Sequence, residues 1–370
     1  MEDGNKQTSY AELLLSSKDL TADMDFFIKI GFRLDNIFPS DDPSVARMSG
    51  LGLKIRIDKS VKTAPPEINI LTDYPESISQ GQDELIAPNG TIVHLLPKTY
   101  ALEIPKTQHH FEIRKLQDND PWIIGRAGML YRDLIPARLG GSIIASHIRI
   151  PNGGPVPDMV HYHTIGFQLI FCYKGWVKLV YEDQGPPFIL NAGDCVTQPP
   201  EIRHRVLEAS DNLEVIEIGV PAEHMTTIDH NLELPTKIYD PNRSFKGHKF
   251  CHHKVKNAEW KPWRIPGFKF RETGINRSTN GIASVQIAKT DIIDVQDIIT
   301  SHDCDILFTF VMEGKMLLKA DGSDIKDLKA GDAFVIPPGL EYKMMERSQN
   351  LELLEVSLPG DFKTFITAIN

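Results

Sequence analysis

Short stretches in which apolar and polar residues alternate dominate the chain beyond its first hundred residues. Residues 142–150, 167–173 and 176–181 are rich in β-branched and aromatic side chains, and glycine or proline residues bound them. This pattern predicts short β-strands. Many short strands joined by regular turns favour a sandwich or a small closed barrel, so we expect a mainly β fold.

The first hundred residues follow a different pattern. Within residues 17–30, the apolar side chains of Leu20, Met24, Phe27 and Ile28 fall on one helical face. Gly31 is expected to end this helix. Strands are predicted on either side of the helix, over residues 11–15, 45–48, 53–57, 67–70 and 91–96. This βαβββ order predicts a small α+β domain.

An internal repeat is the most informative feature of the sequence. Residues 190–200 (LNAGDCVTQPP) match residues 328–338 (LKAGDAFVIPP), and the strand NLEVIE after the first segment matches NLELLE after the second. Both matches have an offset of 138 residues, and an upstream match of residues 171–176 with residues 310–315 has an offset of 139. Such a constant offset indicates two copies of one structural unit.

These patterns divide the chain into five parts. We predict an α+β domain over residues 1–98, a first barrel over residues 141–225 and a second barrel over residues 281–370. Residues 99–140, which contain the stretch Gly125-Arg-Ala-Gly128, are predicted as a linker. Residues 226–280 are rich in proline and are predicted as an irregular arm between the barrels.

Composition and charge exclude several classes of function. Acidic residues number 50 and basic residues 40, and no run of lysine or arginine stands out, which argues against a nucleic-acid partner. No window approaches the ~18 apolar residues of a membrane span. The polar start of the chain lacks the apolar core of a signal peptide, and the four widely spaced cysteines suit reduced thiols. We therefore expect a cytoplasmic protein with no membrane partner.

Three histidines carry the candidate chemistry. His161 and His163 are two residues apart on a predicted strand, so their side chains point to the same face. If that face is the interior of a barrel, His204 from a neighbouring strand can complete a site. Three neutral imidazoles and one oxygen donor suit Fe, Mn, Ni, Cu or Zn. The alternative is that these histidines are structural.

The spacing around these histidines resembles the two motifs of the cupin superfamily. The first motif is H-x-H, three or four residues, E, six residues and G. The second is G, five residues, P-x-G, two residues, H, three residues and N. The positions that match are His161, His163, Gly175, Gly193, Pro199 and His204, and the positions that depart are Gln168 for the glutamate, Glu201 for the glycine and Glu208 for the asparagine.

This resemblance implies a bicupin, in which two tandem cupin barrels (double-stranded β-helix or jelly-roll barrels) follow the α+β domain. It also implies that His161, His163 and His204 hold one divalent metal ion, with Fe(II) favoured. Whether Gln168 supplies the fourth ligand stays open. In the second repeat the four ligand positions hold Thr300, His302, Leu307 and Tyr342, a set that suits a structural barrel better than a metal site. A metal-free ligand pocket is the alternative there.

Other candidate residues have weaker support. His147 and Arg149 share one strand face, and either Arg203 or Arg205 can point into the pocket from beside His204. We include Gln168, Arg149 and Arg205 as candidate catalytic residues, with a solvated surface as the alternative for the arginines. Glu217 is a candidate general base, although its repeat in the second copy as Glu355 favours a structural role. A second cluster of soft ligands comprises His248, Cys251, His252 and His253.

The N-terminal domain resembles one βαβββ half-module of the glyoxalase/bleomycin-resistance (vicinal oxygen chelate) superfamily. The segments that carry this resemblance are LSSKDL from Leu14, FFIKIGF from Phe26 and APNGTIVHL from Ala87. Glu12 and His94 occupy the places at which that family carries metal ligands. Because a full site there needs two half-modules, we favour a docking or dimer-forming role and expect a homodimer.

The leading hypothesis from the sequence is that the chain is a metal-dependent enzyme acting on a small organic substrate. With Gln168 in place of glutamate, every protein ligand is neutral and the metal keeps its full charge of +2, which favours an anionic substrate. The cupin resemblance implies an Fe(II) dioxygenase as the leading activity. The alternatives are a cupin lyase or isomerase, a non-catalytic binding or sensor protein, and a storage protein.

Overall fold

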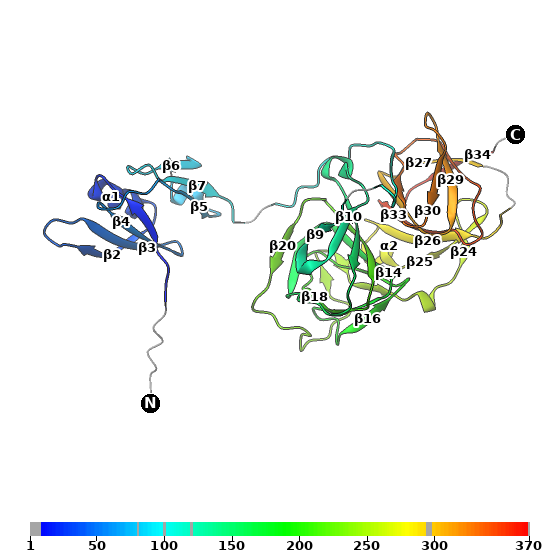
Figure 1. Ribbon diagram of the computed structural model, residues 1–370, viewed down its shortest axis with the longest axis horizontal. Coiled ribbons are helices and arrows are strands. Elements are labelled where there is room, and N and C mark those ends of the chain that lie inside the picture. Colours follow the sequence, from blue (N-terminus) through cyan, green and yellow to red (C-terminus); the bar gives the residue numbers. More distant parts are fainter. Residues whose placement is uncertain (1–8, 80, 99–100, 119–120, 294–297, 369–370) are drawn as a thin grey trace. The chain divides into compact units, whose positions relative to one another are not determined.

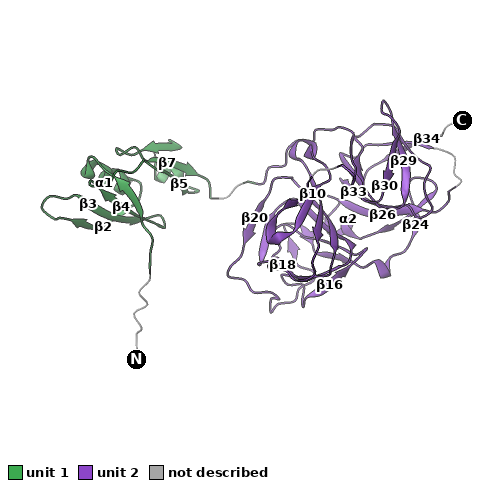
Figure 2. Cartoon of the chain, in the orientation of Figure 1, with its two compact units in different colours: residues 1–101 green, residues 102–370 purple. Residues whose placement is uncertain are grey.

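The computed structural model describes residues 9–368, except residues 80, 99–100, 119–120 and 294–297. The chain forms two compact units, residues 1–101 and residues 102–370 (Figure 2). No helix among the described residues is both long and apolar enough to cross a membrane.

The N-terminal unit begins with a βαβββ motif. Strand β1 (Leu13–Ser16) leads into helix α1 (Leu20–Lys29), and β2 (Arg33–Phe38), β3 (Val45–Gly50) and β4 (Leu53–Asp58) follow. The sheet order is β1-β4-β3-β2, with β1 parallel to β4. Asp19 caps the helix by accepting a hydrogen bond from the backbone N–H of Ala22 at 3.1 Å. Phe27 from the helix is fully buried against the sheet.

A second, three-stranded sheet completes this unit. Strands β5 (Glu67–Leu71), β6 (Glu84–Ile86) and β7 (Ile92–Leu96) have the order β5-β7-β6, with β5 parallel to β7. The predicted βαβββ order is therefore complete by Asp58, and the two later predicted strands belong to this separate sheet. Strand β2 is not among the predicted strands because five of its six residues are exposed, so it has little apolar alternation.

The second unit contains two barrels, each built from two sheets (Figure 1). In the first barrel the seven-stranded sheet has the order β23-β17-β14-β19-β11-β10-β9, and the facing sheet has the order β16-β15-β18-β13-β20, with β12 paired to β18. The strands are β9 (Ile123–Ile124), β10 (Leu130–Asp133), β11 (Ile144–Ile150), β12 (Gly154–Pro155), β13 (His161–Thr164), β14 (Phe167–Lys174), β15 (Trp176–Tyr181), β16 (Phe188–Asn191), β17 (Cys195–Thr197), β18 (His204–Ala209), β19 (Leu213–Val220), β20 (Met225–Ile228) and β23 (Cys251–His253).

The second barrel repeats this plan. Its sheets have the orders β24-β25-β26-β33-β28-β31-β8 and β30-β29-β32-β27-β34. The elements are β8 (Glu112–Arg114), β24 (Lys261–Pro262), β25 (Phe268–Glu272), α2 (Ile275–Ser278), β26 (Ser284–Thr290), β27 (Ile298–His302), β28 (Ile306–Glu313), β29 (Lys315–Ala320), β30 (Lys326–Lys329), β31 (Ala333–Val335), β32 (Tyr342–Met345), β33 (Glu352–Leu358) and β34 (Thr364–Ala368). A short hairpin, β21 (Ser244–Phe245) and β22 (His248–Lys249), precedes β23. The mainly β, two-barrel fold predicted from the sequence is confirmed.

The two barrels exchange their first strands. Strand β8 precedes the strands of the first barrel in the sequence but pairs with β31 of the second. Strand β23 precedes the strands of the second barrel but pairs with β17 of the first. The repeat therefore reaches upstream of both predicted barrels. Residues 99–140, predicted as a linker, supply strands β8–β10, and the predicted irregular arm supplies strands to both barrels.

Two buried arginines reinforce this exchange in equivalent positions. Arg132, on β10 of the first barrel, donates from Nη2 to the carbonyl of Gly331 in the second barrel at 2.6 Å. Arg271, on β25 of the second barrel, donates from Nη2 to the carbonyl of Gly193 in the first at 3.2 Å. A single apolar core that includes Phe171 and Phe308 spans both barrels. The second unit is thus one folded body with internal pseudo-symmetry.

Candidate metal centre

The three predicted ligand histidines converge inside the first barrel. His161 and His163 point to the same face of β13, and His204 on β18 lies directly opposite His161 in the antiparallel ladder. The ring centroids of His161 and His204 are 4.2 Å apart, and one potential ligand atom from each histidine lies within 4.8 Å of the others. Among the described residues, this is the one group of at least three His, Cys, Asp or Glu side chains with metal-ligand spacing.

Hydrogen bonds at Nδ1 orient the three imidazoles. Nδ1 of His161 lies 2.7 Å from the carbonyl oxygen of Met159, and Nδ1 of His204 lies 2.9 Å from that of Ile202. A carbonyl can only accept, so both rings carry their proton on Nδ1 and leave Nε2 free to bind a metal. His163 places its Nδ1 2.8 Å from the hydroxyl of Thr226. Nε2 of His161 is buried and has no hydrogen-bond partner among the described residues.

Burial keeps these imidazoles neutral. Desolvation lowers the pKa of His163 to about 2 and also lowers the pKa values of His161 and His204 below their ordinary value. Neutral imidazole is the form that binds metals. The donor set, its orientation and its protonation therefore all fit a divalent metal ion.

Gln168 is buried on β14, in the sheet that faces β13 and β18. Its Nε2 donates to Oε1 of Glu217 at 2.6 Å. Its own Oε1 is buried and has no hydrogen-bond partner among the described residues. A buried carbonyl oxygen without a partner is unfavourable, and coordination to a metal would satisfy it. The structure is thus compatible with Gln168 as the predicted fourth ligand.

Glu217 is the hydrogen-bond partner of Gln168 and lies in the interior of the barrel. Burial raises the pKa of Glu217, while the hydrogen bond from Gln168 and the positive charge of Arg126 lower it. In the second barrel its equivalent, Glu355, forms a two-point ion pair with Arg264, at 2.7 and 2.5 Å. The two glutamates therefore have different partners, so the repeat of this residue does not by itself make Glu217 structural.

Two cavities adjoin the histidine group. The larger, of about 460 Å³, is polar in part and includes His224 and Thr226 in its wall. The smaller, of about 70 Å³, lies among aliphatic side chains of the barrel interior. The residues common to both walls are Arg126, Tyr131, His163 and Glu217. These four side chains lie where the two cavities adjoin.

Arg126 is the main site residue that the sequence analysis missed. It belongs to the stretch 125–128, which lies in the segment predicted as a linker. In the structure this stretch joins β9 to β10, and the Arg126 guanidinium forms an ion pair with the buried carboxylate of Asp158. Gly125 permits this turn because a Cβ there would lie 2.6 Å from the ring of Tyr131. The glycine next to an arginine was the available signal.

The structure does not bring Arg149 or Arg205 to the cavities. Arg149 binds Glu214 at 3.1 Å and stacks on Trp122, with its guanidinium carbon 4.7 Å from the ring centroid. Arg205 follows His204 on β18, and since side chains alternate along a strand, it faces away from the ligand group. Val206, the next residue, lines the smaller cavity. Both arginines lie outside the walls of the two cavities, and their catalytic role stays a prediction.

The second barrel has a different interior at the equivalent positions. Thr300 donates to the backbone carbonyl of Tyr342 at 3.3 Å, and Nδ1 of His302 accepts the backbone N–H of Cys304 at 3.1 Å. Leu307 is buried and cannot bind a metal. This interior also holds the ion pair of Arg264 with Glu355. The arrangement agrees with the structural role predicted for this barrel.

The predicted soft-ligand cluster is dispersed. Cys251 directs its thiol to the carbonyl of Thr273, His252 stacks on Phe188, and His253 pairs with Arg271. His248 lies in the separate hairpin β21–β22. Within the described residues these four side chains do not form a group with metal-ligand spacing.

The two candidate ligands of the N-terminal unit also have separate partners. Glu12 pairs with Arg47 at 3.1 Å beside the four-stranded sheet. His94, on β7, lies 3.6 Å from each of Glu67 and Glu84 in the three-stranded sheet. The structure therefore does not place Glu12 and His94 in one site.

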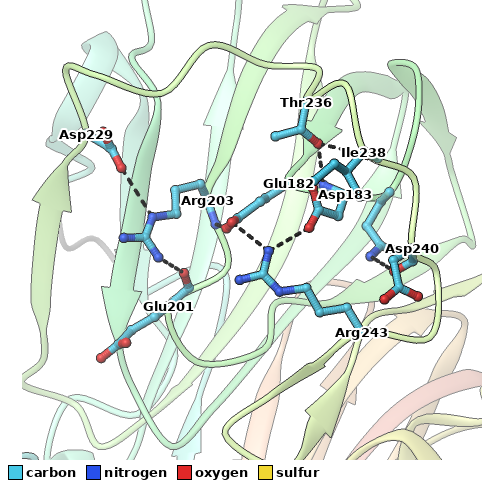
Figure 3. Close-up of polar contacts among 10 residues, drawn as sticks. Glu182, Asp183, Glu201, Arg203, Asp229, Thr236, Ile238, Asp240 and Arg243 are labelled. Carbon is cyan, nitrogen blue, oxygen red and sulfur yellow. Dashed lines mark hydrogen bonds and ion pairs between the residues drawn. The ribbon is translucent and has the colours of Figure 1, made fainter.

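A network of ion pairs fastens the segment after β20 to the first barrel (Figure 3). Arg243 binds both Glu182 and Asp183, at 2.7 and 2.6 Å, and Arg203 binds Asp229 at 3.3 Å. The Arg203 backbone N–H also donates to Glu182. Because Arg203 directly precedes a metal-ligand candidate and β20 carries Thr226, this network supports the strands that position the histidines.

Comparison with solved structures identifies the fold. Salicylate 1,2-dioxygenase from Pseudaminobacter salicylatoxidans aligns with a TM-score of 0.52 at 14% identity, covering 71% of this chain and 90% of that one. Oxalate decarboxylase from Bacillus subtilis aligns with a TM-score of 0.51 at 12% identity, covering 68% and 77%. No family model matches the sequence, and no curated protein matches it.

The chain therefore has the bicupin fold, as the sequence motifs predicted. Identities this low show the fold alone. The glyoxalase-like character of the N-terminal unit stays a prediction.

Proposed function

We propose that the protein is a metal-dependent bicupin enzyme that acts on a small anionic organic substrate in its first barrel. The observation that carries this proposal is the buried group of His161, His163 and His204 beside a cavity of about 460 Å³. A cavity of this size accommodates a small organic molecule. For the N-terminal unit we propose a docking or dimer-forming role.

Different residues of the site would hold the metal and attract the substrate. The three histidines would hold the metal through Nε2, with Gln168 as a fourth ligand. The bound metal would supply Lewis acidity or activate dioxygen. Arg126 adds a positive charge where the two cavities adjoin, partly offset by its ion pair with Asp158, and the neutral ligands would leave the metal its full charge of +2. This balance favours an anionic substrate such as a carboxylate.

Glu217 holds the amide of Gln168 and faces both cavities. Its raised pKa suits a group that accepts or holds a proton near the substrate, so we propose it as the proton-transfer residue. Its position is fixed on the long strand β19, a rigid part of the barrel, as catalytic geometry requires.

We favour an Fe(II) dioxygenase as the specific activity. Support comes from the three-histidine ligand set and from the fold shared with salicylate 1,2-dioxygenase. A lyase is the second candidate, since oxalate decarboxylase shares the fold equally well.

The direct test is metal analysis of the purified protein, followed by an oxygen-uptake screen with small carboxylates. We expect about one metal ion per chain. His163→Ala should remove most of it because one of three imidazole ligands is lost. His302→Ala, the matched change in the second barrel, should leave the metal content unchanged. Metal retained by His163→Ala would overturn the assignment.

A further inference from the structure

The smaller cavity of the first barrel has a wall that differs from that of the larger one. The polar residues of its wall are His163, His204, Arg126, Tyr131, Gln198 and Glu217. All the other residues of the wall are apolar, with Ile170, Val177 and Leu179 among them. A water molecule needs two to four polar partners to be stable in a cavity, and the aliphatic end offers none. We call this space the apolar chamber.

The size of the chamber limits what it can hold. Its volume is about 70 Å³. An apolar cavity of about 150 Å³ in another protein stays dry and binds benzene or xenon. A volume of half that size is too small for a ring and suits a molecule of a few atoms.

The second barrel shows how the same fold fills this space. Val177 pairs with Leu190 on the neighbouring strand, and in the repeat Met316 pairs with Leu328. These pairs identify Met316 as the equivalent of Val177. Met316 is 1% exposed and packs in the core of the second barrel.

A second position shows the same difference. Val206 pairs with Leu179, and in the repeat Met344 pairs with Leu318. Met344 belongs to the same core cluster as Met316. Methionine is long and flexible and fills irregular gaps well. The barrel without the histidine group thus carries two methionines where the barrel with the histidine group carries two valines.

We infer that the apolar chamber is a binding site for a small apolar molecule of the size of dioxygen, placed beside the histidine group. The assignment to dioxygen rests on the proposed dioxygenase function, whereas the binding of a small apolar guest rests on the chamber alone. The guest would reach the ligand histidines from the aliphatic side, while an anionic substrate would occupy the larger cavity on the other side of Arg126 and Glu217.

Xenon is a suitable probe because it is apolar, monatomic and visible in crystals under pressure and by ¹²⁹Xe NMR. We expect xenon to occupy the chamber in the full-length wild-type chain. Val177→Met, which introduces the side chain of the second barrel, should lower xenon occupancy at least about tenfold. It should leave the metal content unchanged, since Val177 is not a ligand. Met316→Val, the reciprocal change in the second barrel, should leave xenon in the first chamber unaffected.

The inference would be wrong if xenon failed to enter the wild-type chamber, or if Val177→Met bound it as well as the wild type. The wild-type measurement decides the matter even if a variant folds poorly. Xenon binding by a protein that retains no metal and consumes no oxygen would sustain the chamber as an apolar site and overturn both the proposed function and the assignment to dioxygen.

Discussion

Each imidazole of the histidine group is fixed through the nitrogen that does not face the metal site. The backbone carbonyls of Met159 and Ile202 accept from the rings of His161 and His204. These carbonyls belong to residues two positions before each ligand, so the local chain itself sets the tautomer. This detail cannot be predicted from spacing, because it depends on how the loop before each strand folds back.

The charge of Arg126 can be tested at the residue scale. We expect Arg126→Met to weaken binding of azide or formate to the metal-loaded protein about tenfold. At an effective dielectric of ~20, a unit charge on Arg126 ~4 Å from the bound anion contributes about 4 kcal/mol to anion binding. The nearby Asp158 carboxylate offsets much of this contribution. The third of this energy that remains corresponds to about a factor of ten in the affinity for the anion. Titration of the anion against metal-loaded wild type and variant measures the effect.

Two further variants make this test specific. Arg126→Lys should retain most of the affinity because the charge remains. Arg205→Met, at the arginine that faces away from the ligand group, should bind azide as the wild type does. Equal anion affinity in Arg126→Met and wild type would remove Arg126 from the substrate site.

A second prediction at the residue scale concerns the buried carboxylate of Glu214 and the dependence of the stability of the fold on pH. Burial would raise its pKa, but the hydrogen bond from His147 and the charges of Lys174 and Arg149 lower it to about 2. The folded value lies below the unfolded value of about 4.3. The carboxylate therefore stabilises the fold fully above pH ~4.3, and this contribution disappears as the pH falls toward 2.

We expect the free energy of unfolding of the wild type to exceed that of Glu214→Gln by on the order of 2 kcal/mol at pH 7. The difference should shrink between pH 5 and pH 3. Urea unfolding at both ends of this range measures it. A difference that stayed constant with pH would show that the charge of Glu214 is not what stabilises this contact.

At the scale of the element, the two repeats place a glycine in the same turn, but the space available for a side chain at that glycine differs. Gly175 and Gly314 both have positive φ, at 76° and 74°. A Cβ at Gly175 would first meet the Ser210 hydroxyl, whereas one at Gly314 would also lie 2.7 Å from the backbone Cα of Leu351. A side-chain hydroxyl can move more easily than a backbone atom.

We therefore predict a ranked series of alanine substitutions. Gly322→Ala, at positive φ but in open space, should cost about 1–2 kcal/mol from the backbone conformation alone. Gly175→Ala should cost more, and Gly314→Ala the most. Urea unfolding of the three variants tests the order, and a Gly322→Ala variant as unstable as Gly314→Ala would contradict it.

The length of a strand decides whether the sequence predicts it. The repeat predicted both barrels because long strands such as β14 and β28 carry enough apolar alternation to be recognised. The exchanged strands β8 and β23 are three residues long, EIR and CHH, and share no pattern. Arg126 was missed for the same reason, since the two-residue strand before it gave no sign that its segment belongs to a barrel. The histidine ligands were found because their chemistry, and not their strand length, identifies them.

The predictions for the whole molecule concern where the chain can be cut. Because residues 1–101 and 102–370 are separate compact units, a chain beginning at residue 102 should fold and bind metal as the full chain does. Thermal unfolding and metal analysis of the shortened chain test this. A folded but metal-free product would mean that the N-terminal unit contributes to the site.

A cut between the barrels should have the opposite result. A chain ending at residue 225, the predicted end of the first barrel, lacks β23 and Arg271 and leaves the edge of β17 unpaired. We expect this chain to aggregate or remain unfolded because an exposed edge strand and a divided core are both unfavourable. Recovery of a soluble, metal-binding first barrel from such a chain would show that the exchange is dispensable.

The exchange of strands also determines the order in which the two barrels can be completed while the chain is synthesised. Cys195 of the first barrel pairs with His253, so β17 gains its partner soon after it is made. Arg114 of β8 pairs with Ala333, 219 residues later in the chain. At ~5–20 residues per second, β8 waits on the order of 10–40 s on the ribosome for its partner. The strand that completes the second barrel is thus among the first of its unit to be made, and the second barrel can close only when nearly the whole chain has emerged.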